Sequence, residues 1–281
     1  MTNAETAIQE GDFARFQELF YRKTGIVFGE SKRYFVDRRL ADRIAATGTG
    51  SFAEYLNLLR FHDPKAVEMQ NLVNAMTVNE TYFYREAYQF RCLVDSILPE
   101  LVRGRRSNDP VQIWSMPCST GEEAYSLAIY LLENWPEVDR YDVRLLASDI
   151  DTRVLEQARA GIYDARSVQH VPPRALGRYF NALGGERWQV VQSLRESIEF
   201  RQVNISSETD MRRFQHVDVI FCRNLLIYFD DASRRRAAEA LHDALRPGGF
   251  VCLGHSESMS RISSLFTARK FADAIVYQRH P

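Results

Sequence analysis

The chain has 281 residues, of which 45% are hydrophobic and 26% charged, and its formal net charge is −1. These values are ordinary for a folded, water-soluble protein and give no electrostatic reason to expect a nucleic-acid partner. No apolar run reaches the ~18 residues of a transmembrane helix, the N-terminus lacks a signal-peptide pattern, and the four cysteines are scattered. We therefore expect a protein of the reducing cytoplasm, without membrane insertion and, because the histidines also lack ligand spacing, without a bound metal.

Residues 1–88 predict a small all-helical domain and a linker. The first helix carries an apolar stripe with helical spacing: Phe13, Phe16, Leu19 and Phe20. A basic amphipathic helix is expected over residues 31–46, and shorter helices are expected over residues 52–61 and 64–73. The linker is expected near residues 77–85.

From residue 89 to residue 281, strand and helix patterns alternate. Strands are expected over residues 111–114, 143–147, 217–222, 250–254 and 271–278, the last as an antiparallel edge. Helices are expected over residues 90–103, 122–134, 152–161 and 231–245. The strand at residues 217–222 is apolar except for Asp218, which is typical of a strand buried on both faces. The order predicts an α/β fold with a mostly parallel sheet between two layers of helices.

Residues 164–203 interrupt this alternation. Short strand patterns at residues 188–192 and 198–202 flank a polar segment at residues 194–197. We expect this region to form a small antiparallel β-subdomain inserted into the larger domain.

A strand, a tight turn and the start of a helix follow one another at residues 111–123, and they predict a ligand-binding edge. The strand breaks at Pro117, and small residues lead from Cys118 to Gly121. The next predicted strand ends in Asp149. A turn of small residues lets a ligand approach the backbone, and an acid after the second strand of a doubly wound sheet accepts hydrogen bonds from ribose hydroxyls.

The residues of this edge do not suit a dinucleotide. The chain has no G-x-G-x-x-G motif, and the helix opens on Glu122 and Glu123. Two carboxylates at a helix N-terminus would repel a pyrophosphate, whereas they would attract a ligand with positive charge. S-adenosylmethionine fits, because it joins an adenosine to an ammonium and a sulfonium. The alternative is that the glutamates only complement the helix dipole.

Four stretches of the sequence match one known family. They read NETYFYRE at residues 79–86, WSMPCSTGEEAYS at residues 114–126, ASDID at residues 147–151 and FCRNLLIYF at residues 221–229. In this order and spacing they closely resemble the chemotaxis receptor methyltransferases, the CheR family. The resemblance covers nearly the whole chain. It implies a Rossmann-like class I methyltransferase sheet with an inserted small antiparallel β-subdomain, preceded by a small all-α N-terminal domain.

The resemblance also implies an activity and a set of cofactor contacts. The family uses S-adenosylmethionine to methylate glutamate side chains on the cytoplasmic helices of chemoreceptors, and releases S-adenosylhomocysteine. In this chain the matching cofactor contacts are Asn79, Thr81, Arg85, Glu123, Asp149, Asn204, Ile205, Arg223, Asn224 and Leu225. Asp149 matches the ribose acid, and Asn204 with Ile205 matches the pair that flanks the adenine.

The residues of the chain agree with this chemistry. A glutamate side chain is ionised near pH 7, so it can attack a sulfonium methyl group without a general base. The reaction then needs orientation of the reactants and exclusion of water. Arg85 and Tyr228 are the residues expected nearest the methyl group. Arg85 would hold the cofactor carboxylate or steer the glutamate through a bidentate contact, and Tyr228 would give one orienting hydrogen bond. The alternatives are a surface ion pair for Arg85 and a core aromatic for Tyr228.

Two further features concern receptor binding. The basic helix carries Arg38, Arg39 and Arg43, which we expect to attract a glutamate-rich receptor helix, although such a face is often merely solvated. Residues 181–188 read NALGGERW, which is shorter and poorer in glycine than the loop that binds a C-terminal receptor peptide in some family members. We therefore expect this protein to act without a tether peptide, and nothing in the sequence requires more than a monomer.

Two other functions remain open. Residues 224–228 follow a strand where amino-methylating nucleic-acid enzymes carry an acid or amide followed by two prolines and an aromatic residue, but here the prolines that shape that turn for a flipped base are absent. The second alternative is a methyltransferase-like domain that binds the cofactor as a sensor without catalysis. A domain that had lost catalysis would be expected to have lost site residues as well, and the presence of Asn79, Arg85, Asp149 and Tyr228 argues against this.

Overall fold

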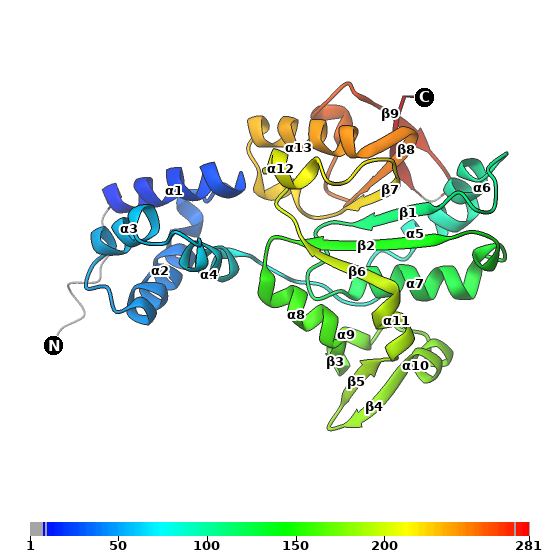
Figure 1. Ribbon diagram of the computed structural model, residues 1–281, viewed down its shortest axis with the longest axis horizontal. Coiled ribbons are helices and arrows are strands. Elements are labelled where there is room, and N and C mark those ends of the chain that lie inside the picture. The colour runs from blue at the N-terminus through cyan, green and yellow to red at the C-terminus, as the bar shows by residue number, and fades with distance from the viewer. Residues whose placement is uncertain (1–7, 9, 273, 281) are drawn as a thin grey trace.

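A bundle of helices lies beside an α/β domain in the computed structural model, which describes residues 8, 10–272 and 274–280 (Figure 1). The helical domain comprises α1 (Glu10–Thr24), η1 (Glu30–Lys32), α2 (Arg33–Thr47), α3 (Phe52–Phe61) and α4 (Val67–Met76). Its core is aromatic at one end, where the rings of Phe16 and Phe20 stack with centroids 5.3 Å apart. In α2 the buried residues are Val36, Leu40 and Ile44, so one stripe of the helix faces the core and its other faces carry the arginines.

The α/β domain is built on a seven-stranded sheet. Its strands in spatial order are β6 (Ile198–Gln202), β2 (Val143–Asp149), β1 (Val111–Ser115), β7 (Val217–Cys222), β8 (Leu245–Leu253), β10 (Ile275–Arg279) and β9 (Phe266–Lys270). The first five are parallel, and β10 runs antiparallel to both of its neighbours. The chain passes from β1 outward to β2 and β6, then returns to β7 on the other side of β1. The carboxyl ends of β1 and β7 therefore form the switch point at which ligands bind in open α/β sheets.

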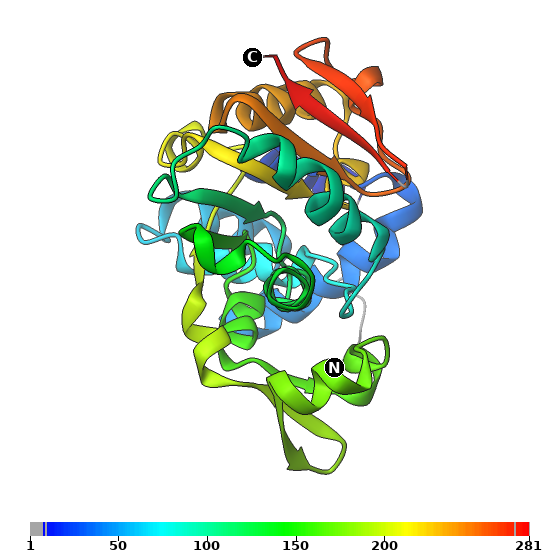
Figure 2. The same ribbon diagram turned by 90° about the vertical axis from the view of Figure 1, so that its right-hand side faces the viewer.

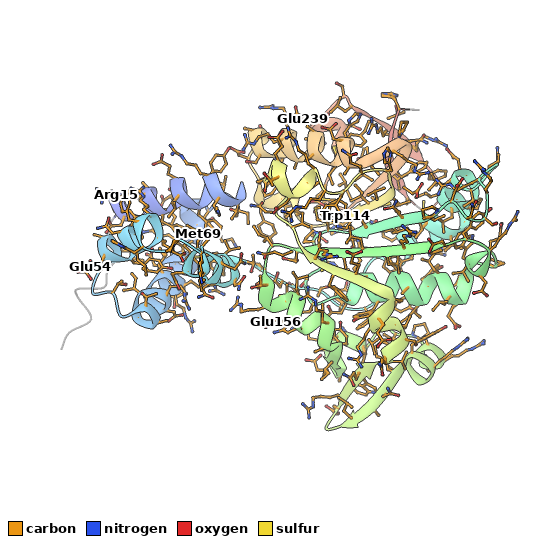
Figure 3. The ribbon with its side chains drawn as sticks, viewed as in Figure 1. Arg15, Glu54, Met69, Trp114, Glu156 and Glu239 are labelled. Carbon is orange, nitrogen blue, oxygen red and sulfur yellow. The ribbon has the colours of Figure 1, made fainter. Side chains whose placement is uncertain are left out.

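Helices cover both faces of this sheet, because successive side chains of each strand point to opposite faces. Ile113 belongs to a buried cluster with residues of α7 (Glu122–Asn134) and α8 (Thr152–Ala160), together with a continuous helix formed by α5 (Tyr88–Cys92), η2 (Leu93–Ile97) and α6 (Leu98–Leu101). The next residue, Trp114, belongs to a second cluster with α12 (Glu208–Met211) and α13 (Asp231–Ala244). Figure 3 marks Trp114 in the sheet and Glu239 on α13. The expected fold class is confirmed.

A separate antiparallel sheet of three strands projects from the domain between α8 and β6. Its strands in spatial order are β3 (Ile162–Asp164), β5 (Arg187–Val190) and β4 (Phe180–Gly184). The helices α9 (Ala165–Val168), α10 (Pro173–Tyr179) and α11 (Gln192–Ser197) accompany it. Figures 1 and 2 both place the β4–β5 hairpin at the end of the domain opposite to β9 and β10.

The inserted subdomain differs from the expected segment at both ends. The expectation that residues 198–202 belong to it is wrong, because β6 pairs in parallel with β2, from Leu145 opposite Ile198 to Asp149 opposite Gln202. The subdomain also begins before residue 164, since β3 pairs with β5. The single strand expected over residues 271–278 is likewise replaced by the antiparallel pair of β9 and β10.

The two domains meet beside the carboxyl end of β7. The N–H of Val27 donates to the carbonyl of Tyr228 at 3.0 Å, and Ile26 forms an isolated antiparallel bridge with Phe229. In addition, α4 packs against α8. The helical domain is therefore joined both to the loop that follows β7 and to the helix that follows β2.

Candidate active site

The turn after β1 is the local structure on which the site depends. A cis peptide bond precedes Pro117, and the N–H of Cys118 donates to the carbonyl of Ser148 at 2.8 Å, so the turn is bonded to β2. Gly121 then precedes α7 with a φ of 96°, and a Cβ atom there would lie 3.0 Å from the Cβ of Ala158. Glycine is required because it combines this backbone conformation with the close packing of α7 on α8.

Two adjoining cavities lie beyond the carboxyl ends of β1, β2 and β7. The larger has a volume of about 260 Å³, and its walls include many polar residues and part of the linker before α5. The smaller has a volume of about 30 Å³ and is lined mainly by apolar side chains. Pro117 and Asp149 line both cavities, so the two form one elongated site.

The structure brings together the residues that were expected to contact the cofactor. The larger cavity is lined by Asn79, Thr81, Arg85, Glu123, Asp149, Arg223, Asn224 and Tyr228. The smaller cavity is lined by Asp149, Asn204, Ile205 and Leu225. Neither cavity is lined by the three arginines of α2 that were expected to bind the receptor, which are Arg38, Arg39 and Arg43.

Asp149 is the buried acid of the site, with 3% of its surface exposed. Its Oδ2 accepts a hydrogen bond from the N–H of Ser119 and its Oδ1 accepts one from the N–H of Asp151, both at 2.9 Å. Burial raises the pKa of Asp149 to about 6, although these two hydrogen bonds favour the ionised form and oppose the rise. The carboxylate is therefore fixed in place, largely ionised at pH 7, and has lone pairs left for further donors.

Arg223 is a buried guanidinium between two carboxylates. Its Nη1 lies 2.6 Å from Glu123 Oε2, and its Nη2 lies 3.2 Å from Glu86 Oε2 and donates to the carbonyl of Arg85 at 2.7 Å. Burial lowers the pKa of Arg223, but the charges of Glu123 and Glu86 more than offset this, and the net shift is upward. Its Nε is buried and has no acceptor among the residues that the structure describes. One donor on the cavity wall is therefore unused.

Asp151 holds the first part of the linker. It is fully buried, and its Oδ2 accepts hydrogen bonds from Thr77 Oγ1 at 2.6 Å and from Asn79 Nδ2 at 3.0 Å. Ser119 Oγ donates to the carbonyl of Asn79 at 3.2 Å. The position of Asn79 at the cavity is thus set by the acid that follows β2 and by the turn that follows β1.

Arg85 lies between two residues of unusual backbone conformation. Tyr84 has a φ of 61° and Glu86 a φ of 56°, in a region that residues other than glycine rarely adopt. The N–H of Tyr84 donates to Ser126 Oγ at 2.9 Å, which ties this segment to α7. The guanidinium of Arg85 makes a single hydrogen bond within the described part of the chain, to the carbonyl of Glu80 at 3.0 Å. Most of its five N–H groups therefore remain available to a ligand.

Glu257 holds the loop that follows β7. Its Oε2 accepts hydrogen bonds from the N–H groups of Asn224 at 2.8 Å and Gly254 at 2.9 Å, and its Oε1 accepts one from the N–H of Leu226 at 2.7 Å. A Cβ atom on Gly254 would lie 2.8 Å from Nδ2 of Asn224. The missing side chain of Gly254 therefore allows the loops after β7 and β8 to approach each other.

The loop after β7 ends in η4 (Leu226–Tyr228), which brings Tyr228 to the larger cavity. Burial raises the pKa of the Tyr228 hydroxyl, and the positive charge of Arg85 opposes this rise. The hydroxyl is protonated at pH 7 and can donate a hydrogen bond. Arg85 and Tyr228 are only partly buried, and exposed residues such as Ile227 line the same cavity, so an incoming macromolecule can reach this part of the site.

Three acidic residues that support the site had no expected role: Glu86, Asp151 and Glu257. Asp151 and Glu257 follow the carboxyl ends of β2 and β8, which is the signal that pointed to Asp149. Inspection of every acid after a predicted strand would have found both. Glu86 could not be found in this way, because its role depends on its contact with Arg223.

Arg38, Arg39 and Arg43, the arginines of α2 that were expected to bind the receptor, have different surroundings. Arg43 donates to both carboxylate oxygens of Glu68, at 2.9 and 2.6 Å. Arg39 donates to the carbonyl of Ala75 at 2.6 Å. Arg38 is exposed. Two of the three therefore have partners within the helical domain.

Comparison with known families covers both domains. The family model of the CheR methyltransferase all-alpha domain matches residues 11–77, and that of the CheR methyltransferase SAM binding domain matches residues 79–275. The chain belongs to the CheR methyltransferase family. This membership confirms the expected enzyme class, a protein methyltransferase dependent on S-adenosylmethionine.

CheR-family relatives match over nearly their full lengths. The chain is 48% identical to chemotaxis protein methyltransferase 2 of Vibrio cholerae, over 98% of this chain and 95% of the relative. It is 41% identical to chemotaxis protein methyltransferase 2 of Pseudomonas aeruginosa, over 94% of this chain and 92% of the relative. It is 36% identical to the chemotaxis protein methyltransferase of Escherichia coli, over 94% and 90% of the two chains.

The site of this CheR-family protein fits S-adenosylmethionine chemically. The apolar side chains that line the smaller cavity suit contact with a flat purine, and the buried carboxylate between the two cavities suits a pair of ribose hydroxyls. The larger cavity contains both carboxylates and guanidinium groups, as the ammonium and carboxylate of an amino acid require. No group of three or more histidine, cysteine, aspartate or glutamate side chains that could hold a metal ion occurs in residues 8, 10–272 and 274–280.

Proposed function

We propose that this protein transfers the methyl group of S-adenosylmethionine to glutamate side chains on the cytoplasmic helices of chemoreceptors. The observation that carries the proposal is the larger cavity, whose lining combines Arg85 and Tyr228 with the carboxylates of Glu123 and Asp149. The names of the relatives, which are chemotaxis protein methyltransferases, support this class of substrate.

Each part of the cofactor has matching residues in the two cavities. Asp149 accepts the ribose hydroxyls, and the adenine packs against the lining of the smaller cavity, where its proposed contacts are Asn204, Ile205 and Leu225. The methionine part occupies the larger cavity, whose proposed contacts are Asn79, Thr81, Arg85, Glu123, Arg223 and Asn224. The sulfonium of the bound cofactor supplies the methyl group.

The chemistry requires positioning rather than proton transfer. The receptor glutamate is ionised near pH 7, so its oxygen is already a nucleophile. Arg85 orients the incoming carboxylate through its free N–H groups, and the hydroxyl of Tyr228 adds one hydrogen bond. The linker and the loop after β7, fixed by Asp151 and Glu257, exclude water around the reacting groups.

We also propose that α2 takes part in receptor binding, chiefly through Arg38. Arg39 and Arg43 contribute positive charge to the same helix, but each already has a partner in the helical domain. An exposed arginine can attract an acidic receptor helix and pair with it at little cost, because nothing has to be broken first. Substitution of Arg38 should therefore affect receptor binding, whereas substitution of Arg39 or Arg43 should also disturb contacts within the helical domain.

The β4–β5 hairpin supports the proposal that no tether peptide is needed. The two strands are joined directly through Gly185 and Glu186, both of which have positive φ values. A turn of this length leaves no extended glycine-rich loop on which a receptor C-terminus could dock. Binding of a receptor C-terminal pentapeptide, measured by calorimetry, would contradict this part of the proposal.

We place the protein in the cytoplasm as a monomer, because the proposed receptor helices lie there and one chain contains the whole site. Within the described ranges of the chain, no helix is long and apolar enough to cross a membrane.

The test is transfer of a labelled methyl group from S-adenosylmethionine to a receptor cytoplasmic fragment. We expect a base-labile label on the receptor, as a glutamyl methyl ester gives, and its loss in Arg85→Ala. Arg166→Ala is the matched control, because Arg166 is an exposed arginine whose partner, Glu80, belongs to the same linker. Cofactor binding without receptor label would favour the sensor function, and label on nucleic acid would favour the other alternative.

A further inference from the structure

One groove beside the active site has no role in the methyl transfer proposed above. It has a volume of about 340 Å³ and lies between η4, the first turns of α13 and η5 (Met259–Arg261). Ile227, which is 46% exposed, lines both this groove and the larger cavity. The groove therefore begins at the residue that precedes Tyr228, and whatever binds in it lies next to the reacting groups.

The groove carries positive charge that the fold does not use. Arg235 and Arg261 are exposed, and neither guanidinium group has a hydrogen-bond or ion-pair partner in the described part of the chain. Arg234 has a different role, because its Nε donates to the carbonyl of Leu226 and its Nη1 lies 3.2 Å from Asp231. Arg234 and Asp231 therefore largely neutralise each other, whereas Arg235 and Arg261 remain available.

The second acid of the groove, Glu257, forms no ion pair with these two arginines in the described part of the chain, because its carboxylate oxygens accept three backbone N–H groups of the loops after β7 and β8. These hydrogen bonds leave its charge in place. Three arginines against two acids still give the lining of the groove a net positive charge, beside the apolar side chain of Ile227.

We propose that this groove binds the segment of the receptor helix adjacent to the methylated glutamate, with Arg235 and Arg261 facing receptor carboxylates and Ile227 facing an apolar side chain. The inference rests on the proposed function. Successive turns of a helix are about 5.4 Å apart, so a glutamate that enters the cavity beside Tyr228 carries a neighbouring turn over Ile227. A glutamate-rich helix supplies the complementary negative charge.

The test compares methyl transfer to a receptor cytoplasmic fragment by three forms of the full-length protein. These are the wild type, the double variant Arg235→Gln with Arg261→Gln, and the double variant Arg235→Glu with Arg261→Glu. We expect the receptor KM to rise in this order, by roughly tenfold or more in the charge-reversed form, because like charges then oppose each other. We expect an unchanged kcat and an unchanged cofactor affinity by calorimetry.

Arg144→Glu is the matched control. Arg144 is an exposed arginine at the amino end of β2, the end opposite to Asp149, and its reversal should leave the receptor KM unchanged. An unchanged receptor KM in both groove variants would overturn the inference while the proposed function stands, and so would a fall in kcat alone. Absence of receptor label with the wild type would instead overturn both.

Discussion

Nη1 of Arg223 lies 2.6 Å from Oε2 of Glu123, and the two side chains are only 3% and 11% exposed. This pair joins the loop after β7 to the start of α7, so it spans the switch point of the sheet. It also gives the two glutamates at the start of α7 different surroundings. Glu122 bonds to Thr120 and Ser167 and does not line the cavity, whereas Glu123 faces it with its charge largely balanced by Arg223.

Substitution of Arg223 should destabilise the whole protein. Arg223→Ala removes the guanidinium that pairs with the largely buried carboxylates of Glu123 and Glu86, so we expect a loss of about 3–5 kcal/mol in the free energy of unfolding. Urea denaturation measures this loss. Arg140→Ala, which breaks an exposed pair with Glu137, should cost less than about 1 kcal/mol. Equal effects of the two substitutions would show that the buried cluster is not what holds the strand ends together.

Cofactor binding should weaken in mild acid. The proposed ribose contact uses the ionised carboxylate of Asp149, whose pKa is raised by burial to about 6 in the free protein. The carboxylate is ionised above this pH, so affinity should be constant there and should fall as the pH drops through about 6. Calorimetric titration between pH 5 and pH 7.5 tests this. Asp149→Asn should bind more weakly at every pH and should lack this transition; a transition that persists in Asp149→Asn would assign it to another group.

Glu257 should be a positioning residue for the loop that carries Asn224 and Tyr228. Glu257→Ala leaves three backbone N–H groups without their acceptor, and we expect roughly 1–3 kcal/mol less stability for each N–H that remains buried. Glu257→Gln keeps one acceptor oxygen and should fold. It should lower kcat and raise the cofactor KM together, because the displaced loop contributes to both. Wild-type kinetics in Glu257→Gln would show that Glu257 does not position this loop for catalysis.

The hydroxyl of Tyr228 should matter for the rate and not for cofactor affinity. Tyr228→Phe keeps the ring and removes one hydrogen bond, so we expect kcat to fall by roughly tenfold, the equivalent of about 1.4 kcal/mol. Single-turnover methyl transfer and cofactor calorimetry separate the two quantities. A loss of cofactor affinity with an unchanged rate would place the hydroxyl on the cofactor instead.

Arg38 and Arg43 should respond differently to charge reversal. Arg38→Glu should raise the receptor KM severalfold and leave thermal unfolding unchanged, because Arg38 is exposed. Arg43→Glu should lower the stability of the helical domain, because it places a carboxylate against Glu68, which is 8% exposed. Kinetics with a receptor fragment and thermal melts distinguish the two effects. An Arg38→Glu variant with unaltered receptor kinetics would exclude α2 as a binding surface.

Most of the fold could be predicted because apolar residues recur with a clear helical or strand period along its long elements. The largely apolar strand Val217–Cys222 and the helix Glu122–Asn134 have the expected bounds. β6 was misassigned for a physical reason. Ile198 and Phe200 alternate with exposed residues, and a parallel edge strand and one arm of a hairpin show the same period of two. Only the pairing with β2, which is distant in sequence, separates them.

The candidate site could be predicted where residue type and position in the sheet coincide. An acid after the second strand pointed to Asp149, and the linker motif pointed to Arg85. The partners of Arg39 and Arg43 could not be predicted, because they lie on α4 and depend on how two helices pack. Likewise, the sequence does not show that Arg223 neutralises Glu123, since the two are joined only when β1 and β7 become neighbours.

The hydrogen bond from Val27 to the carbonyl of Tyr228 has a consequence for protein engineering. A fragment that starts at residue 79 would keep the sheet and the cavity acids Glu123 and Asp149. However, the loop that carries Tyr228 would lose its hydrogen bond to Val27. Anyone grafting this transferase onto a foreign recognition module should carry residues 10–28 with it. We therefore expect a fragment cut at the linker to be less active than the full chain, because Tyr228 would be less firmly positioned.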